Sequence, residues 1–356
     1  MDVADRLLAW FSARARTLPW RETPRDPYRV LVSEVMLQQT QVDRVVPRYR
    51  AFLERFPDVE ALAAAPEEAV LEAWSGLGYY RRARNLHAAA RAVAAAGGRF
   101  PARAAALRAL PGVGEYTAAA VASLAFGEAV PVLDGNVLRV GSRFLALDVP
   151  ARGAPGRRRI AAWVGTLMAG RPPGRINEAL MELGATVCAR TAPACGECPL
   201  AAACGGRASG DPGRWPEPRR TRRPERIAWI AALAFDPAGR LLLRRIDEGP
   251  ILRGLWLPPL GTVREDADPA AEAAALLAGI VPVGPGQAAA PVRHAIAHRR
   301  LEVRPVVFGA GPDGALGGAW RWADPGRPGV PTSSLLRKVL GAAAAVPVPP
   351  FGSGVD

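Results

Sequence analysis

The spacing of apolar residues predicts a run of helices from Asp2 to about Leu183, because apolar positions recur there every three and four residues. Short glycine clusters at 76–78 and 97–98 interrupt this run, as expected at helix ends. After Arg226 the apolar stretches become shorter and are separated by turn residues. The sequence therefore predicts an all-α first half and a different fold in the second half.

The second half begins with two apolar stretches, IAWIAALAFD and RLLLRR, on either side of DPAG at 236–239, which is typical of a hairpin turn. The segment ADPAAEAAALLAG predicts a helix, LEVRPVVFGA another strand, and TSSLLRKVL a last helix capped by Thr332 or Ser333. We therefore expect an α+β domain over residues 227–340 and a disordered tail at 341–356.

Residues 205–226, between the two halves, read GGRASGDPGRWPEPRRTRRPER. Prolines and charges are too frequent there for a regular helix or strand, so this segment is expected to be a linker. Its arginines are also suited to contact a phosphate backbone. The expected organisation is a helical domain at 1–204, this linker, and the α+β domain.

The length and the net charge of the chain indicate how many domains it has and what kind of partner it binds. A chain of 356 residues is longer than one compact core usually is, in line with two domains. The net charge is +13, and every basic residue except Lys338 is arginine. A GC-rich genome would explain arginine in place of lysine, but not the excess of positive charge. That excess lies in residues 1–204, with 26 basic and 19 acidic residues, and in the linker, with seven and three. A polyanionic partner is therefore expected.

No export or membrane-spanning segment is expected. Asp2, Asp5 and Arg6 interrupt the start of the chain, and prolines break its longest uncharged run, at 273–292. The chain therefore reads as cytoplasmic.

All four cysteines lie in CARTAPACGECPLAAAC, spaced C-x6-C-x2-C-x5-C: Cys188, Cys195, Cys198 and Cys204. A disulfide framework is not expected without an export signal. Structural zinc usually takes two paired half-sites, whereas this stretch has one Cys-x-x-Cys and two single cysteines. The pattern favours a [4Fe–4S] cluster, with zinc as the alternative.

This spacing, following INEALMELGATVC, resembles that of the endonuclease III and MutY family of DNA glycosylases, and the resemblance extends over most of Leu7 to Cys204. It implies an all-α helix-hairpin-helix glycosylase fold in which the cluster holds a basic loop against DNA and is not the catalyst. A ferredoxin-like electron carrier is the competing class, but it would leave most of the chain without a role.

The turn LPGVG, residues 110–114, lies between ARAAALRAL and a predicted helix near Glu115. Gly112 and Gly114 can adopt positive φ, which lets the backbone approach another surface closely with helix N–H groups pointing outward. An ordinary αα-hairpin would explain this turn taken alone. The resemblance instead identifies it as the helix-hairpin-helix that grips a DNA phosphate.

Asp134, in VPVLDGN, follows an apolar run and is suited to cap a helix. In the resembled family the aspartate of this motif faces the sugar of the extruded nucleotide, so Asp134 is expected to stabilise the positive charge that develops there or to act as the nucleophile. Asn136, in the same motif, is expected to contact DNA. Tyr116 stands where bifunctional members carry a Schiff-base lysine, and no lysine precedes Lys338. The resemblance thus implies base removal without strand cleavage.

Glu34, in VLVSEVMLQQTQV, lies three and four residues from Leu31, Val30 and Leu37. On such an apolar stripe desolvation would raise its pKa and keep a proton available, whereas a solvated glutamate is the alternative. SEVMLQQTQV also resembles the MutY motif in which the glutamate protonates the leaving adenine. Gln39 matches a glutamine that enters the DNA stack, and Leu37 is expected to contact the substrate.

Further resemblances concern the substrate pocket. Trp20 and Arg21, in LPWR, resemble residues around the adenine, although the loop to Glu34 is about one residue longer than in the family. Tyr79, in GLGYY, matches a second residue inserted into DNA, with a core position as its alternative. Glu178, in INEALMEL, matches a pocket residue, and a solvated helix face would explain it equally well.

Residues 227–340 resemble the C-terminal domain of MutY, a Nudix-like fold that reads 8-oxoguanine opposite adenine. The Nudix metal box is missing, so pyrophosphate hydrolysis is not expected, and GLWLPP at 254–259 lacks the family's acidic residue. In HAIAH, residues 294–298, Ala297 replaces a family serine that binds 8-oxoguanine, and His298 matches a family histidine. Plain strand positions are the alternative for both.

The expected function is that of a monofunctional adenine DNA glycosylase in base excision repair. It would act as a monomer on duplex DNA that contains adenine opposite 8-oxoguanine or guanine, and would associate with the nucleoid. A glycosylase of the same fold for thymine or uracil and a non-catalytic lesion binder are the alternatives. The carboxylates of Glu34 and Asp134 argue against a non-catalytic binder, and the resemblance of the second domain to that of MutY favours adenine as the target base.

Overall fold

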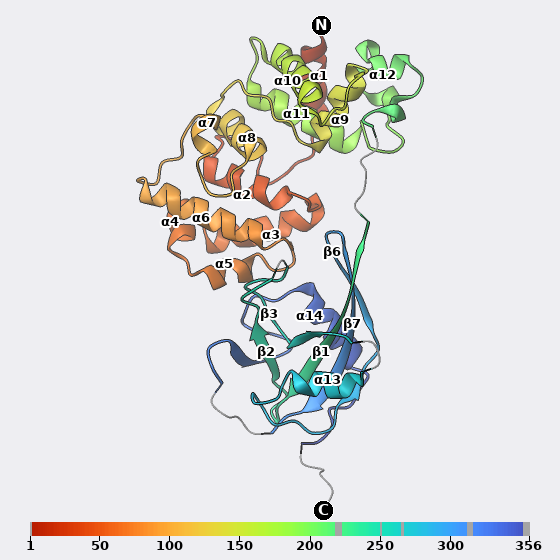
Figure 1. Ribbon diagram of the computed structural model, residues 1–356. Coiled ribbons are helices and arrows are strands. Elements are labelled where there is room, and N and C mark those ends of the chain that lie inside the picture. Colours follow the sequence, from red (N-terminus) through yellow and green to blue (C-terminus); the bar gives the residue numbers. More distant parts are fainter. Residues whose placement is uncertain (1, 218–222, 250, 265–266, 312–315, 352–356) are drawn as a thin grey trace, which may run out of the picture. The chain divides into compact units, whose positions relative to one another are not determined.

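The computed structural model describes residues 2–217, 223–249, 251–264, 267–311 and 316–351. Its contacts divide the chain into two compact units (Figure 1). The first unit comprises Met1–Ala65 and Arg81–Arg220, and the second comprises Pro66–Tyr80 and Thr221–Asp356. The helix α5 (Glu67–Ala73) therefore belongs with the second unit, although it lies within the helical half of the sequence.

The first unit is all-α, as the apolar spacing predicts. Four of its helices begin at an aspartate whose side chain accepts a backbone N–H of the first turn, namely Asp2, Asp26, Asp58 and Asp134. The described helices of this unit are α1 (Val3–Arg14), α2 (Pro27–Leu37), α3 (Val42–Arg55), α4 (Val59–Ala64), α6 (Arg81–Ala95), α7 (Ala104–Leu107), α8 (Glu115–Phe126), α9 (Gly135–Phe144), α10 (Ala154–Met168), α11 (Pro173–Thr186) and α12 (Gly205–Ala208).

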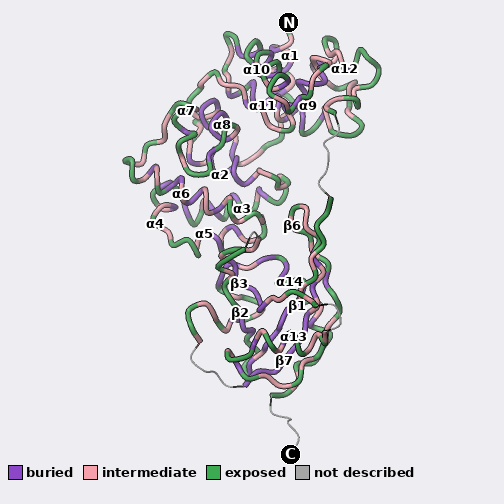
Figure 2. The backbone as a smooth tube through the Cα atoms, in the orientation of Figure 1, coloured by how far each residue is buried: buried purple, intermediate pink, exposed green. Residues whose placement is uncertain are grey.

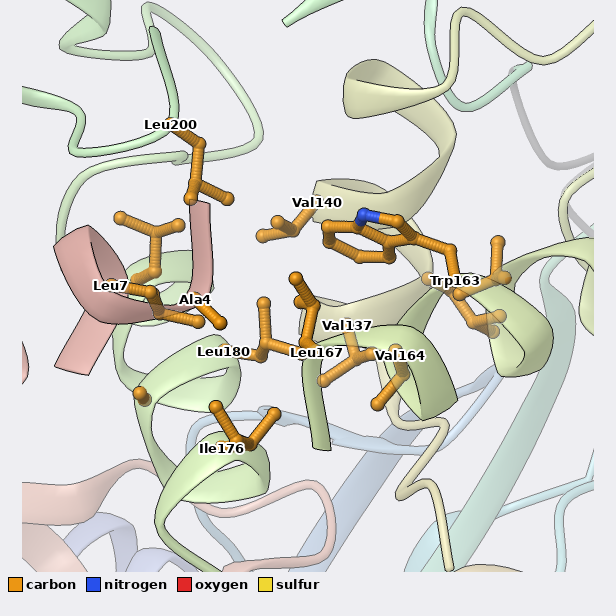
Figure 3. Packing of buried hydrophobic residues seen from close by; sticks show 14 of the residues in the cluster. Ala4, Leu7, Val137, Val140, Trp163, Val164, Leu167, Ile176, Leu180 and Leu200 are labelled. Carbon is orange, nitrogen blue, oxygen red and sulfur yellow. The ribbon is translucent and has the colours of Figure 1, made fainter. Parts of the chain in front are cut away.

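The helices α1, α9, α10 and α11 share one hydrophobic core. Leu7, Val137 and Leu180, from three of these helices, are fully buried in it. Figure 3 shows their side chains converging together with Trp163 and with Leu200 of the cysteine segment. Burying one such aliphatic side chain contributes about 1.5–3 kcal/mol. This core fixes α9 against α11, the two helices that carry most of the acidic residues described below.

Helices α2 and α8 are buried along most of their length (Figure 2). On α2 every residue from Val30 to Met36 is buried, including Ser33 and Glu34. The two helices have only 11 and 12 residues. In the described part of the chain no helix is long and apolar enough to cross a lipid bilayer.

The segment 205–226 is folded in its first part, so the expectation of a linker is wrong there. The helix α12 follows the last cysteine, and Trp215 packs against the core of the first unit. The indole N–H of Trp215 donates to the carbonyl oxygen of Leu147 (2.6 Å). One aromatic side chain thus anchors a segment whose composition otherwise resembles a linker. Residues 218–222 lie outside the described residues.

The second unit is built on a mixed sheet, which confirms the expected α+β fold. The two longest strands, β1 and β7, run parallel, from Glu225 beside Arg299 to Phe235 beside Gly309. Phe235 also pairs with Leu241 in the predicted β1–β2 hairpin. The described strands are β1 (Glu225–Phe235), β2 (Leu241–Arg245), β3 (Trp256–Leu257), β4 (Leu260–Thr262), β5 (Gln287–Ala288), β6 (Val292–Ile296), β7 (Arg299–Gly309) and β8 (Trp320–Ala323). Their order is β3-β2-β1-β7-β5, with β4 paired to β1, β6 to β7 and β8 to β2.

Two helices, α13 (Pro269–Ala275) and α14 (Ser334–Ala343), cover opposite faces of this sheet. Leu233 of β1 packs in the cluster that contains α14, whereas Ile230 packs in the cluster that contains α13. Because both faces are covered, β1 reads as a nearly continuous apolar run. Of the two expected caps, Ser333 is the one that caps α14.

The tail was expected to be disordered from Gly341, and this is wrong as far as Phe351. The chain there lies against the end of β7: a Cβ placed on Gly309 would be only 2.0 Å from the carbonyl oxygen of Pro349. The missing side chain lets the tail approach the strand, which composition alone does not reveal. Residues 352–356 lie outside the described residues.

Candidate active site

Glu34 lies on α2 with 4% of its surface exposed. The helix begins where the side chain of Asp26 accepts the backbone N–H groups of Tyr28 and Arg29 (2.7 and 3.1 Å). Pro27, in the first helical position, has the φ that this position requires. The carboxyl group is therefore held within the protein, and the alternative of a solvated glutamate is wrong.

Tyr116, the second residue of α8, donates a hydrogen bond from its hydroxyl to Oε2 of Glu34. The same hydroxyl lies 3.9 Å from the sulfur of Met181. Burial, together with the negative charge of Glu34, raises the pKa of Tyr116 well above its usual value. The phenol therefore stays neutral and acts as a hydrogen-bond donor to the carboxyl group.

Asp134 is the N-cap of α9, as its sequence context predicts. Its Oδ1 accepts the backbone N–H of Val137 (2.6 Å) and its Oδ2 accepts the amide N–H of Asn136 (2.9 Å). Burial raises the pKa of Asp134, while these two hydrogen bonds favour the ionised form and offset part of that effect. The group is thus both a helix cap and a buried carboxylate.

Burial raises the pKa of Glu34 to about 7. The hydrogen bond from Tyr116 and the positive charge of Arg21 act in the opposite direction, whereas the negative charges of Asp134 and Glu178 raise the pKa further. The Glu34 carboxyl therefore keeps its proton to higher pH than an ordinary glutamate does. A protonated carboxyl can donate a proton and an ionised one can stabilise positive charge, the two roles that paired acids take in other enzymes.

Glu178 and Glu182, one turn apart on α11, hold the loop that precedes α2. Nη2 of Arg25 donates to both oxygens of Glu178 (2.8 and 2.7 Å). Arg16 and Arg21 donate to Glu182 (2.7 and 2.9 Å). Burial alone would raise the pKa of Glu182, but these arginines lower it to about 2, so it remains ionised. Glu178 is buried too, which rules out a solvated helix face.

Sequence reasoning missed Arg16, Arg25 and Glu182. The spacing of four residues between Glu178 and Glu182 could have indicated that both lie on one helix face. The two arginines lie in an irregular loop, and only the tertiary structure determines its path. This ion-pair network joins the loop to α11 and brings Arg21 within range of Glu34.

Trp20 joins this network through its backbone, because its carbonyl oxygen accepts a hydrogen bond from Nη1 of Arg25, whereas its ring packs elsewhere. It is 7% exposed, and its ring packs edge-to-face against Tyr49, with the ring centroids 5.4 Å apart. The same loop places Arg21 within 3.5 Å of Glu178. Of the two residues predicted from LPWR, Arg21 is the one whose charge acts on Glu34.

The turn at 110–114 separates α7 from α8. Gly112 has φ +71°, and a Cβ placed there would lie 2.3 Å from the Cβ of Asn85 on α6, so both the conformation and the close approach require glycine. Gly114 has φ −84° and forms the N-cap of α8, so the expectation of positive φ is wrong for it. The space beside Gly114 is open, which leaves the start of α8 accessible to an anion.

Leu37 and Gln39 lie at the C-terminal end of the helix that carries Glu34. Leu37 is its last residue, and Gln39, two residues further on, is exposed with φ +60°. Tyr79 belongs to the other compact unit, so the structure does not join it to this site. It is 43% exposed, which rules out a core position, and its φ of +49° is also left-handed.

Ala297 and His298 form the turn between β6 and β7, also in the second unit. Ala297 has φ +54°, so it is a turn residue and not a strand position. Nε2 of His298 lies 3.3 Å from Oε2 of Glu225, which the Nε of Arg299 approaches to 2.9 Å. The turn is thereby tied to the first residue of β1.

The four cysteines, Cys188, Cys195, Cys198 and Cys204, line one hollow together with Arg143, and they form no disulfide. Among the described residues, no three Cys, His, Asp or Glu side chains converge closely enough to hold a single metal ion. In a [4Fe–4S] cluster each thiolate binds a different iron, so the sulfurs stand farther apart than the four ligands of one zinc. Four thiols around one hollow are the donor set that such a cluster would take.

Two arginines on α9, which the motifs did not single out, contact the cysteine segment. Arg139 donates to the carbonyl oxygen of Cys188 (2.9 Å) and to Oδ1 of Asn136 (2.9 Å). Nη1 of Arg143 lies 3.3 Å from the sulfur of Cys188. Because Asn136 also binds Asp134, α9 links the cysteine segment to the carboxylate by side-chain hydrogen bonds.

Comparisons with known proteins agree with this arrangement. Residues 32–153 match the HhH-GPD superfamily of base excision DNA repair proteins. The chain is 44% identical over 211 residues to an adenine DNA glycosylase of Mycolicibacterium smegmatis, covering 58% of this chain and 70% of that protein. It is 37% identical over 320 residues to a mouse adenine DNA glycosylase, covering 74% of this chain and 62% of that protein. It spans 48% of an Arabidopsis thaliana relative.

A solved structure of a thermostable thymine-DNA glycosylase is also similar. It shares 30% sequence identity and a TM-score of 0.53, over 58% of this chain and 95% of that chain. The part of this chain that matches this structure is about as long as the first, all-α unit. The HhH-GPD match includes Glu34, Tyr116 and Asp134, and an adenine DNA glycosylase is matched over most of its length. The chain therefore belongs to the adenine DNA glycosylase family of HhH-GPD base excision DNA repair proteins.

Proposed function

We propose that this protein is a monofunctional adenine DNA glycosylase, which binds double-stranded DNA as a monomer and removes adenine paired with 8-oxoguanine or guanine. The observation that carries the proposal is the buried carboxyl of Glu34, with its pKa raised to about 7, beside Asp134. The net charge of +13 suits a DNA partner. The names of the matched adenine DNA glycosylases support adenine as the base.

The proposed reaction uses the two carboxyl groups in different ways. Glu34 gives its proton to a ring nitrogen of the adenine, so that the bond between the sugar C1′ and the base breaks and the base leaves neutral, with the bonding electrons. Asp134 stabilises the positive charge that develops on the sugar. Water then adds to C1′ and releases a proton, which leaves an abasic sugar and free adenine. Tyr116, hydrogen-bonded to Glu34, fixes the acid in place.

A panel of duplexes tests this function. Adenine, thymine or uracil is placed opposite 8-oxoguanine or guanine, and base loss is scored as strand breaks after alkali. Cleavage of the adenine duplexes alone supports the proposal. Loss of thymine or uracil would favour the second candidate, a mismatch glycosylase of the same fold, which the likeness to the thymine-DNA glycosylase suggests. Tight binding without any base loss would favour a lesion binder.

Borohydride is expected to trap no covalent protein–DNA product during adenine removal. A trapped product requires an imine between an amine and the sugar, but Tyr116 offers a phenol, and Lys338 is the only lysine of the chain. The check is a denaturing gel of the reaction with and without borohydride, beside a lyase-competent glycosylase as the positive control. An efficient adduct would mean that the enzyme is bifunctional.

The proposed cofactor is a [4Fe–4S] cluster held by Cys188, Cys195, Cys198 and Cys204, which would fix the surrounding basic loop for DNA binding. Purified protein should be yellow-brown and contain about four irons per chain. Iron and zinc are measured on the same sample by elemental analysis. A colourless protein with about one zinc per chain would contradict the cluster.

Ala297 leads to a prediction about lesion preference. We propose that the β6–β7 turn contacts the base opposite the adenine and that alanine there lacks a side-chain hydrogen bond. Ala297→Ser should therefore raise the preference for 8-oxoguanine over guanine about twofold to tenfold, since a neutral hydrogen bond contributes about 0.5–1.5 kcal/mol. Binding to both duplexes, each with an uncleavable adenine analogue, measures the ratio. An unchanged ratio would exclude this contact.

A further inference from the structure

The C-terminal end of α2 is capped by a side chain from another helix. The last turn of α2 has no basic residue, and its C-cap is Gln38. Arg82 of α6 supplies the missing donors: its Nη1 donates to the carbonyl oxygens of Val35 (2.9 Å), Met36 (2.8 Å) and Gln38 (2.6 Å). Its Nη2 donates to Oγ1 of Thr40 (3.0 Å). One guanidinium thus satisfies carbonyls that a helix end otherwise leaves without partners, and its charge suits that end of the helix dipole.

Gln39 lies between two of these contacts. Its φ of +60° is left-handed, a conformation that is unfavourable for a residue with a side chain and persists where neighbouring groups hold it. Arg82 binds the carbonyl of Gln38 on one side of Gln39 and the hydroxyl of Thr40 on the other. The amide of Gln38 also donates to Oγ1 of Thr117 on α8 (3.2 Å). The backbone turn is therefore held from two helices, while the side chain of Gln39 is exposed.

The helix that carries Arg82 is itself held in place near this turn. Asn85, one turn further along α6, fills the space that a side chain on Gly112 would need. Arg82, Gln38, Asn85 and Gly112 all line one small hollow between α2, α6 and the hairpin turn. The position of the guanidinium therefore depends on the packing of α6 against the hairpin.

We propose that Arg82 is a positioning residue that holds the left-handed turn at Gln39 and thereby determines how efficiently the target nucleotide leaves the DNA stack. This rests on the proposed glycosylase function. Arg82 acts through its contacts with the residues on either side of Gln39 and takes no part in proton transfer from Glu34. A nucleotide must leave the stack before its base can be removed, so a misplaced turn should impair extrusion more than binding.

The fluorescence of a base analogue in the DNA measures extrusion of the target nucleotide separately from removal of its base. A 2-aminopurine is placed beside the target adenine, and the protein carries Glu34→Gln so that the adenine is not removed from the bound DNA. Adding Arg82→Met, which keeps the length of the side chain but removes its donors, should reduce the fluorescence rise at saturation about fivefold. The matched control is Arg91→Met, which replaces an exposed arginine on the same helix and should leave the rise unchanged. Equal rises in both variants would overturn the proposal.

Single-turnover rates in protein with an intact Glu34 test whether Arg82 acts through Gln39. Arg82→Met and Gln39→Gly should each slow adenine release about 10- to 100-fold, the size expected from misplacing a positioning group. The double variant should be no more than about threefold slower than the slower single variant, because two residues of one unit are not additive. If the rate reductions of the two single variants multiply in the double variant, then Arg82 acts independently of Gln39 and the proposal is overturned.

Thr40→Val keeps the test decisive if Arg82→Met fails to fold. It removes the hydroxyl that accepts from Nη2 of Arg82 and donates to the carbonyl oxygen of Gln38 (3.5 Å). It should slow adenine release about threefold to tenfold, with a correspondingly smaller fluorescence rise. Thr40→Val with the parent rate and the parent fluorescence would overturn the proposal. A parent protein that releases no adenine would instead defeat the proposed function, and the fluorescence comparison of Arg82→Met with Arg91→Met would still decide the role of Arg82.

Discussion

Replacement of Glu34 by glutamine is expected to slow adenine release about 100- to 10,000-fold, the contribution of a well-placed general acid. Glutamine keeps the shape of the side chain, and its amide oxygen can still accept the hydrogen bond from Tyr116. It has no acidic proton to give to the departing base. The measurement is the single-turnover rate on a duplex with adenine opposite 8-oxoguanine, together with the affinity for the same duplex, which should be retained.

The rate of adenine release by the parent enzyme is expected to fall as the pH rises. In the proposed mechanism Glu34 acts in its protonated form, and its pKa is raised to about 7, so the rate should be level below that pH and fall about tenfold per pH unit above it. Tyr116→Phe is the matched control. It removes a hydrogen bond that favours the ionised form, so the fall should move to higher pH. A Glu34→Gln variant with near-normal turnover would remove Glu34 from the mechanism.

Asp134→Asn is expected to slow adenine release about 100- to 1,000-fold, the usual loss when one electrostatic stabiliser of a transition state is removed. The two roles of Asp134 can be separated by this substitution. Asparagine is as good an N-cap as aspartate, so its side-chain oxygen should still accept the backbone N–H of Val137. The free energy of unfolding should therefore change by less than about 1 kcal/mol. The rate is measured at single turnover, and stability by thermal unfolding.

Asp58→Asn is the control for this comparison. Asp58 caps α4 through the backbone N–H of Ala61 (2.7 Å) in the same way, and it is exposed. It should leave both the rate and the stability close to those of the parent. If Asp134→Asn behaves like Asp58→Asn, then Asp134 is a helix cap alone and another group stabilises the charge on the sugar.

Local pattern was enough for the secondary structure and for part of the site. Apolar spacing predicted α2 and the burial of Glu34, because a residue three and four places from apolar neighbours shares their helix face. The position of Asp134 predicted a helix cap for the same local reason. In the second unit, DPAG at 236–239 predicted the hairpin between β1 and β2. The expectations that were wrong for whole segments, those containing Trp215 and the described tail, concern parts of the chain held by distant contacts.

By itself the sequence determined which residue types stand at the site: an acid on a buried stripe, a second acid at a helix start, a tyrosine in place of lysine, and four clustered cysteines. Only the tertiary structure decided how they combine. The hydrogen bond from Tyr116 to Glu34 spans 82 residues, and that from Arg25 to Glu178 spans 153. Arg82 likewise reaches the end of a helix more than forty residues before it. Such pairs have no local spacing rule, because their distance depends on how whole helices pack, and a pKa of about 7 at Glu34 arises only when that packing excludes water.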